Sequence, residues 1–233
     1  LSLLPEAPPR LAGVELASRC VPATHVGGDY YDFFPRGDQV VDIAIADVSG
    51  HNVGAALIMV ETRSVLRAQV DTTDSTREIV TRLNELLYED LTRAELFITM
   101  FYAKYDAASR LLTYSSAGHN RPVLFRPTQA ACLDLDAEGL ILGVKQSYEF
   151  EERELTLLEG DVLLFYTDGV TEATNLAGEM FGAERLCPML ERHHEESAET
   201  ILAEIFSEVN AFAQTPGLAD DISVVVMKIT GDH

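Results

Sequence analysis

The stretch that decides the fold is "VGGDYYDFF" at residues 26–34, followed after a short apolar run by "IADVSGHNVG" at residues 45–54. Each stretch carries an aspartate at a position where burial alone favours an apolar side chain. Asp29 follows two glycines, and Asp47 ends a hydrophobic run. A carboxylate taken out of water needs a compensating partner. These two stretches therefore indicate a chemical role beyond packing.

The overall composition is that of one large domain. The chain has 233 residues, of which 47% are hydrophobic, and this is enough apolar material for a continuous core. No apolar run approaches the roughly 20 residues that cross a bilayer, and the N-terminus lacks the pattern of a signal peptide. We therefore expect a soluble protein with no membrane partner.

The formal net charge of -21 excludes one class of partner and complicates another. Nucleic-acid binding needs a footprint of lysines and arginines, so no nucleic acid is expected. A surface this acidic also repels phosphorylated ligands unless bound cations reverse the sign locally. The simpler interpretation, that the charge only keeps the protein in solution, stays open.

The three cysteines, Cys20, Cys132 and Cys187, are odd in number and far apart. They show no CxxC spacing, so the sequence predicts neither a disulfide framework nor a zinc site. A reducing, cytoplasmic location fits this usage best.

The pattern of apolar residues predicts grouped strands and helices. Strands are expected at 13–22 and 38–47 with a GGD turn between them, and a largely buried helix at 51–70. Ser75 and Glu78 form a capping box for a second helix that ends near residue 91. Six short strands are predicted next, at 96–106, 110–117, 122–126, 131–135, 148–157 and 161–167. Helices are predicted after Gly182 and from Ser197, and a last strand at 222–229. This grouping favours an α+β layered sandwich.

Strand-end turns carry the aspartates that suggest a site. The motifs are "GGDYYD", "IADVSG", "YTDGVTE" and "LADDIS", and their acids are Asp29, Asp47, Asp168, Asp220 and Asp221. If these turns meet at one edge, several like charges share a small volume, which requires raised pKa values or bound cations. Ligation by oxygen alone selects Mg²⁺ or Mn²⁺ over zinc.

Each motif alone also has an ordinary structural interpretation. "DG" is usually a turn, "DD" is often a solvated strand entry, His51 can be a capping or core residue, and "AGHN" at 117–120 can be a plain loop. The motifs in this order are far more specific than any one of them.

Together they resemble a known family, the SpoIIE and RsbU-type branch of the PPM metal-dependent serine/threonine phosphatases. The matching stretches cover roughly residues 11–230 and are "GGDYYDFF", "IADVSGHNVGAALIM", "TMFYAKYD", "YSSAGHNRPVLF", "LLFYTDGVTEATN" and "DDISVVVMKI". The "LLP" near the start resembles the junction after an upstream regulatory domain. Residues 1–10 are thus expected to be the tail of a linker, and 11–231 the phosphatase domain.

The resemblance implies a four-layer αββα sandwich of two antiparallel sheets flanked by helices, with two or more Mn²⁺ or Mg²⁺ ions at one end. By position it implies these ligands: Asp29, Asp47 as the bridging carboxylate, the main-chain carbonyl of Val48, Asp168 and Asp220. It makes Asp221 an accessory ligand or a supporting residue, and Asp32 supporting structure.

The implied activity is hydrolysis of a phosphoserine or phosphothreonine on a protein, by direct attack of a hydroxide that bridges the metals. The implied partners are a STAS-type anti-sigma-factor antagonist as substrate and a regulatory domain of the same chain; a homodimer is left open. Two rival hypotheses are a catalytically silent phosphatase-like module and a structural Ca²⁺-binding domain. No D-x-D-x-D-G loop supports the latter.

The sequence departs from the family pattern at three points. Aligned on Asp47, Ser49 stands where eukaryotic relatives have a histidine that protonates the leaving group, and His51 comes two places later. Asn52 stands where this branch commonly has glycine. No clear counterpart of the phosphate-binding arginine of eukaryotic relatives is found. The general acid is therefore not identified.

Overall fold

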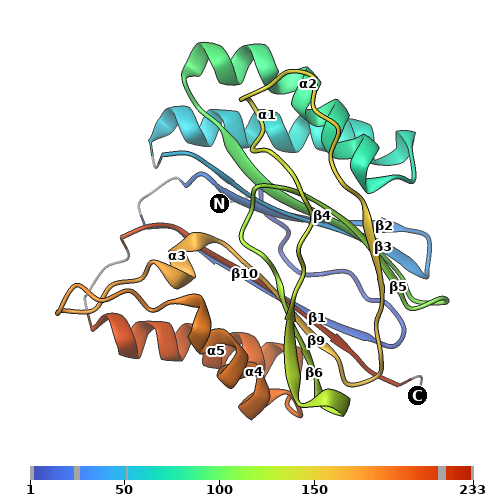
Figure 1. Ribbon diagram of the computed structural model, residues 1–233, viewed down its shortest axis with the longest axis vertical. Coiled ribbons are helices and arrows are strands. Elements are labelled where there is room, and N and C mark those ends of the chain that lie inside the picture. Colours follow the sequence, from blue (N-terminus) through green and yellow to red (C-terminus); the bar gives the residue numbers. More distant parts are fainter. Residues whose placement is uncertain (1–2, 24–26, 51, 215–218, 232–233) are drawn as a thin grey trace.

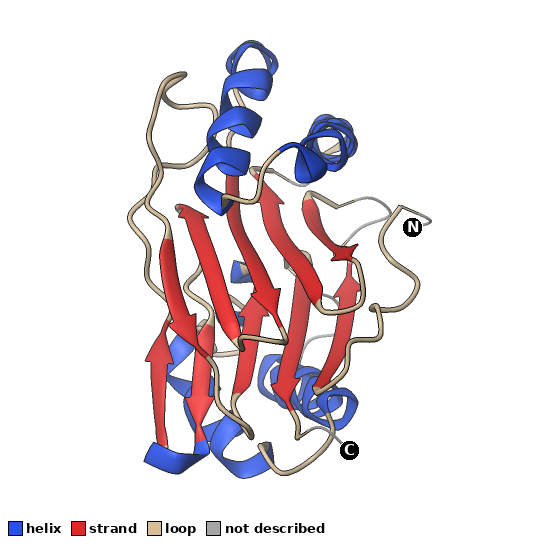
Figure 2. Ribbon diagram, turned by 90° about the vertical axis from the view of Figure 1, so that its right-hand side faces the viewer, coloured by secondary structure: helices blue, strands red, loops and turns tan. Residues whose placement is uncertain are grey.

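A computed structural model describes residues 3–23, 27–50, 52–214 and 219–231. Two five-stranded antiparallel sheets lie face to face, and helices cover their outer faces (Figure 1). Figure 2 shows the strands in the middle of the molecule, with helices above and below them. The predicted α+β, four-layer αββα sandwich is confirmed.

One sheet is built around the C-terminal strand. Its order is β1-β10-β9-β6-β7, with all neighbours antiparallel. The bounds are β1 Val14–Val21, β10 Ile222–Ile229, β9 Val162–Tyr166, β6 Val123–Arg126 and β7 Ala131–Asp134.

The other sheet has the order β2-β3-β4-β5-β8 and is also antiparallel. The bounds are β2 Asp29–Arg36, β3 Val40–Val48, β4 Ile98–Asp106, β5 Leu111–Ala117 and β8 Arg153–Thr156.

Two pairs of helices complete the layers. On the β2–β8 sheet lie α1 (Val53–Gln69) and α2 (Thr76–Ala94), and on the β1–β7 sheet lie α4 (Leu186–His193) and α5 (Ala198–Ala213). A single-turn helix, α3 (Asp168–Thr171), follows β9. The buried apolar residues form three clusters, one between the sheets and one under each helical layer, as four layers require.

Side-chain caps define where the helices begin. Ser75 accepts a hydrogen bond from Glu78 N at 3.3 Å and Ser197 from Thr200 N at 3.2 Å, so the predicted starts of α2 and α5 are confirmed. Asn52 caps α1 by accepting from Ala55 N at 3.0 Å. The prediction that α1 is buried is wrong for one face, because Val53 and Leu57 are 66% and 65% exposed.

The turn predicted around GGD leads directly into a strand that the sequence analysis missed. β2 pairs with β3 over its whole length, from Asp29 opposite Asp47 to Arg36 opposite Val40. Its first six residues are all buried, so the alternation that identifies a strand is absent. Pro35 is tolerated because β2 is the edge of its sheet.

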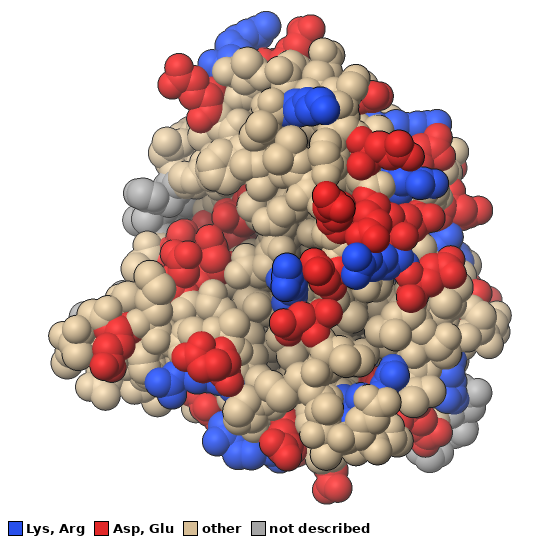
Figure 3. All heavy atoms as spheres, in the orientation of Figure 1, with Lys and Arg blue, Asp and Glu red and all other residues tan. Residues whose placement is uncertain are grey.

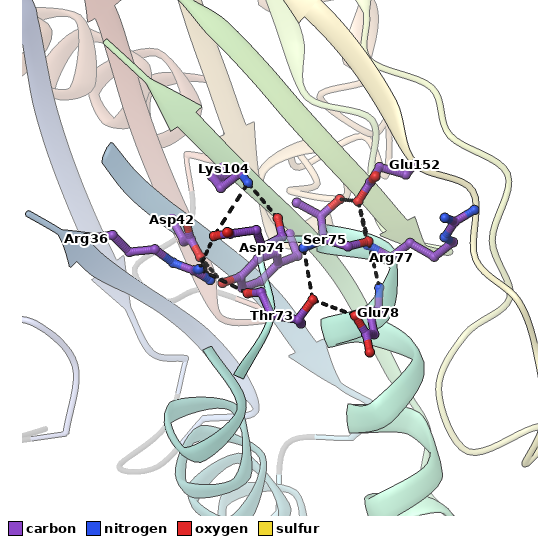
Figure 4. Close-up of polar contacts among 11 residues, drawn as sticks. Arg36, Asp42, Thr73, Asp74, Ser75, Arg77, Glu78, Lys104 and Glu152 are labelled. Carbon is purple, nitrogen blue, oxygen red and sulfur yellow. Dashed lines mark hydrogen bonds and ion pairs between the residues drawn. The ribbon is translucent and has the colours of Figure 1, made fainter. Parts of the chain in front are cut away.

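A polar network fixes the connection between α1 and α2 to the sheet (Figure 4). Asp42 is fully buried; it lies 2.6 Å from the Arg36 guanidinium and accepts a hydrogen bond from the Tyr102 hydroxyl at 2.5 Å. Arg36 also donates to Asp74, whose carbonyl accepts from Lys104 at 2.6 Å. Burial raises the pKa of Asp42, and its partners oppose that shift. This network lies at the end of β2 away from Asp29.

The cysteine prediction is wrong at one pair. Cys132 in β7 and Cys187 in α4 form a disulfide with a Cα separation of 5.9 Å, and Cys20 is free. The two cysteines are 55 residues apart in sequence, so no spacing rule could pair them. In the described ranges, no helix is both long and apolar enough to cross a membrane.

Candidate functional site

Two of the predicted aspartates lie directly opposite each other. Asp29 opens β2 and Asp47 lies near the end of β3, and they are register partners in the antiparallel ladder. Opposed residues in such a ladder have Cβ atoms about 5 Å apart. Asp29 is 4% exposed and Asp47 is partly buried. Two like charges are thereby held at one edge of the sheet.

The other sheet brings its aspartates to the same edge. Asp168 follows β9 as the first residue of α3, and Asp220 and Asp221 precede β10. Figure 1 shows α3 beside the end of β10 and next to the other sheet. A hydrogen bond joins the sheets here, because Thr167 Oγ1 donates to Asp29 Oδ2 at 2.8 Å. Chain segments far apart in sequence therefore meet at one place.

Asp221 is committed to holding a loop. Its two carboxylate oxygens accept hydrogen bonds from Ala23 N and Gly28 N, both at 2.8 Å, and its side chain is buried. Asp220 is exposed, and its Oδ1 accepts from Asp221 N at 2.8 Å. These contacts match the supporting role foreseen for Asp221 better than a role as ligand.

The glycines of the motifs permit close approach to these groups. A Cβ on Gly27 would lie 2.2 Å from Asp221 Oδ2, and one on Gly28 would lie 2.5 Å from the carbonyl oxygen of Val48. On Gly169, after Asp168, it would lie 1.9 Å from the Asp221 carbonyl oxygen. All three contacts are shorter than a side chain allows, so the motifs pack against one another only with glycine at these positions.

The carboxylates of the cluster are near enough to raise one another's pKa values. Burial, together with the charges of Asp221 and Asp168, raises the pKa of Asp29 to about 7, although Thr167 opposes the shift. Burial and then the charges of Asp29, Asp168, Asp220 and Asp221 raise the pKa of Asp47 to about 8. The pKa of Asp168 is raised by burial first and then by Glu172 and Asp220.

The donor set fits a hard cation that carries the missing positive charge. Within the described ranges none of the five aspartates takes part in an ion pair, although each is within electrostatic reach of another. Acidic side chains also gather over the region of α3 (Figure 3). No three acidic, histidine or cysteine residues of the described chain already stand close enough together to hold a metal ion.

Three residues near the cluster were missed or undervalued from the sequence. Thr167 connects Asp29 to the other sheet, and Ser223 N donates to its hydroxyl at 2.9 Å. Thr99 is the register partner of Asp47 on β4, and its hydroxyl is 2.8 Å from His119 Nδ1. His119 belongs to the "AGHN" stretch, which by itself is typical of an ordinary loop. The position of this stretch in the ordered series of motifs is the signal that could have identified the residue.

His119 is a buried, neutral imidazole. Burial lowers its pKa to about 3, and the Tyr166 backbone is its other polar neighbour. The ring bonds through Nδ1 to Thr99 on β4, and its Nε2 is buried without a hydrogen-bond partner among the described residues. Such a ring is suited to positioning, not to exchanging protons near neutral pH.

The residues after Asp47 serve the local structure. Ser49 Oγ accepts a hydrogen bond from Phe97 N at 3.0 Å and so ties the turn to the start of β4. Asn52 caps α1, which gives a physical reason for the residue at this position. His51, the other candidate for a general acid, lies outside the described residues.

A cysteine nucleophile is disfavoured at this edge. Cys20, on β1, is opposite Ser223 in the ladder. Burial raises the pKa of its thiol to about 12, and the charges of Asp29 and Asp221 add to the effect. The thiolate, which is the nucleophilic form, is therefore scarce at neutral pH.

Comparison with known proteins places this arrangement in a family. The family model described as stage II sporulation protein E (SpoIIE) matches residues 37–230. Among curated relatives, "Phosphoserine phosphatase RsbU" of Bacillus subtilis (strain 168) is 30% identical over 227 residues, which are 97% of this chain and 67% of the relative.

Solved structures share the fold. The RsbU and RsbW domains of Rv1364c from Mycobacterium tuberculosis superpose with a TM-score of 0.80 at 23% identity, covering 97% of this chain and 63% of that one. RsbX in complex with magnesium gives a TM-score of 0.72 at 16% identity, covering 93% of this chain and 96% of that one. The chain thus spans about two thirds of RsbU and of the Rv1364c structure.

Proposed function

Because the chain belongs to the SpoIIE family of PP2C-type serine/threonine phosphoprotein phosphatases, we propose that it hydrolyses a phosphoserine or phosphothreonine on a signalling protein with the help of divalent cations. The observation that carries the proposal is the meeting of buried carboxylates from both sheets with no cationic side chain paired to them in the described ranges. A cation site is the simplest arrangement that makes this cluster favourable.

The proposed ligands are those carboxylates and one carbonyl. Asp29, Asp47, Asp168, Asp220 and the main-chain oxygen of Val48 would hold two or more Mn²⁺ or Mg²⁺ ions, and Asp221 would act mainly by holding the backbone at Ala23 and Gly28. Divalent cations bound there would lower the pKa of water and neutralise phosphoryl oxygens. The magnesium in the RsbX structure supports the choice of a hard cation.

The chain's own residues would prepare the site for this chemistry. Thr167 holds the Asp29 carboxylate, and His119 bonds to Thr99, the register partner of Asp47 on β4. The largely protonated Cys20 leaves direct hydrolysis, without a covalent phosphoenzyme, as the route we favour. The positive charge of the bound cations would locally overcome the repulsion between a phosphate and a chain of net charge -21.

The proposed substrate is a STAS-type anti-sigma-factor antagonist, and the proposed regulator is an upstream domain of the same polypeptide. The name of RsbU, a phosphoserine phosphatase, supports the reaction. We place the catalytic domain at residues 11–231, preceded by a linker tail at 1–10. Homodimerisation and the cytoplasmic location stay predictions.

The test separates cation binding from turnover. The chain is titrated with Mn²⁺ by calorimetry, and phosphate release from a phosphoserine peptide is measured with Mn²⁺ and with EDTA. We expect binding, turnover that EDTA abolishes, and loss of both in Asp47→Asn; Asp38→Asn, an exposed turn acid, is the control. Binding without turnover supports the silent module, and activity that survives in Asp47→Asn contradicts the proposed site.

A further inference from the structure

A polar cavity of about 520 Å³ opens at His119, whose partner Thr99 lies opposite Asp47 in the β3–β4 ladder. One wall is the turn between β5 and β6, with His119 and Arg121; another is the segment after β7, with Asp136; the start of β8 adds Arg153. The proposed chemistry leaves this cavity without a role.

The walls of the cavity are closely packed. A Cβ on Gly139 would lie 1.7 Å from the Ser116 carbonyl oxygen, and one on Gly118 would lie 2.6 Å from Ile141 Cγ2. Glu151 N donates to the Glu138 carbonyl oxygen at 3.1 Å, which closes the far wall. The cavity is thus a fixed feature of the fold.

A short series of contacts connects the cavity to the aspartates. His119 lines the cavity and bonds to Thr99, which is the register partner of Asp47. Arg121 follows His119 by two residues. A protein segment that presents its phosphorylated residue to the aspartate cluster can therefore extend along this turn.

Arg121 is the cation that such a segment would meet. It lines the cavity and also a second one of about 380 Å³, so it forms the ridge between them. Its Nε is 3.2 Å from Asp136 Oδ1, and the two side chains are 59% and 49% exposed. An exposed pair of this kind contributes at most about 1 kcal/mol, so another carboxylate can replace Asp136 easily.

Arg153, which also lines the cavity, has a comparable pairing. Its Nε is 2.9 Å from Glu151, and the two side chains are 44% and 36% exposed. Both arginines already carry a carboxylate, which shows that their surroundings accept one. Asp136 and Glu138 line the same cavity, so the two arginine charges are balanced within it, and an incoming carboxylate has to displace one that the chain supplies.

We propose that this cavity is a docking subsite for the substrate protein, in which Arg121 leaves Asp136 and binds a carboxylate that flanks the phosphorylated residue. The proposal rests on the proposed phosphatase function. It makes Arg121 a specificity residue that contacts the substrate outside the reacting phosphate. A guanidinium that binds a carboxylate discriminates by charge and by geometry.

The test uses two phosphoserine peptides that differ only in having glutamate or glutamine on both sides of the phosphoserine. The wild type should show a KM about two- to threefold lower for the glutamate peptide, because an exposed ion pair contributes at most about 1 kcal/mol and the incoming carboxylate has to replace Asp136. Arg121→Gln should lose this preference. Asp136→Asn, which frees Arg121, should increase it.

Arg93→Gln is the matched control, since Arg93 lies on α2 and its side chain is 77% exposed. It should keep the wild-type preference. Binding of the two peptides to the Asp47→Asn protein, measured by fluorescence anisotropy, provides a second readout that needs no turnover.

Equal KM values for the two peptides in the wild type, or an unchanged preference in Arg121→Gln, would overturn the subsite. If Arg121→Gln also raised the KM for an aryl phosphate, which has no flanking carboxylate, the subsite would again be overturned, because Arg121 would then act on the phosphate itself. A wild type without activity on the aryl phosphate contradicts the phosphatase function instead, so the two failures can be told apart.

Discussion

Asp29 and Asp47 face each other across the β2–β3 ladder, and Thr167 of the other sheet donates a hydrogen bond to Asp29 at 2.8 Å. Like charges directly opposite in a ladder are destabilising. The chain therefore holds an arrangement that reduces its stability in the absence of a cation, as is common where function conflicts with packing.

The first prediction concerns the pH dependence of stability without metal. The pKa values of Asp29 and Asp47 are raised to about 7 and about 8, so the folded state binds more protons than the unfolded state at intermediate pH. The contribution of these two groups to the free energy of unfolding is fully present below about pH 4 and is lost as the pH rises to about 8. Asp47→Asn should be more stable than the wild type at pH 8, by on the order of 3 kcal/mol.

Chemical unfolding in EDTA at a series of pH values measures this difference. The gap between Asp47→Asn and wild type should close as the pH falls toward 4, while Asp38→Asn should follow the wild type throughout. Added Mn²⁺ should raise the Tm of the wild type more at pH 8 than at pH 5 and should do little for Asp47→Asn. An Asp47→Asn protein that is less stable than the wild type at pH 8 in EDTA would contradict the prediction.

The second prediction concerns Gly27. In Gly27→Ala the new methyl group would lie 2.2 Å from Asp221 Oδ2, so the carboxylate that holds Ala23 N and Gly28 N must move. We expect kcat/KM for a phosphoserine peptide to fall about 100-fold, because a displacement of about 1 Å at a site can have this effect. Gly37→Ala, with φ +70 and open space around it, should lose about 1 kcal/mol of stability with unchanged kcat/KM. Equal activity in the two variants would exclude the packing argument.

The third prediction concerns the contact between Thr99 and His119. Thr99→Val removes the hydroxyl that lies 2.8 Å from His119 Nδ1 and leaves a buried polar atom without that partner. We expect a loss of about 1–3 kcal/mol in stability and a Mn²⁺ affinity about tenfold weaker, because Thr99 is the register partner of Asp47, a proposed ligand, and groups behind a ligand orient it. Calorimetry reports the affinity, and Thr72→Val, at an exposed threonine, is the control. A normal affinity in Thr99→Val would show that the contact serves folding alone.

The fourth prediction concerns the disulfide. Cys132 and Cys187 close a loop with a sequence separation of 55, so the bond should contribute about 4 kcal/mol by restricting the unfolded chain. Dithiothreitol should lower the Tm of the wild type and leave Cys132→Ser unchanged. Thiol titration of the unfolded, unreduced protein should find one free cysteine, Cys20; three free thiols would mean that the bond does not form.

Local sequence signals account for most of the secondary structure. The capping serines at 75 and 197 predict where α2 and α5 begin because a cap depends only on neighbours along the chain. β2 was missed because burial on both of its faces removes the alternation on which a strand prediction depends. Likewise, the exposure of Val53 and Leu57 depends on which face of α1 packs against the sheet.

The sequence by itself determined the order of the motifs, the grouped strands and helices, and the aspartates at strand ends; these features are local or follow from the resemblance that the motifs carry. Only the tertiary structure decided that Asp29 faces Asp47, that Thr167 joins the two sheets at Asp29, that His119 meets Thr99, and that Cys132 meets Cys187. The physical reason is that pairing register and sheet stacking are set by many weak contacts between distant segments, which no short stretch of sequence contains.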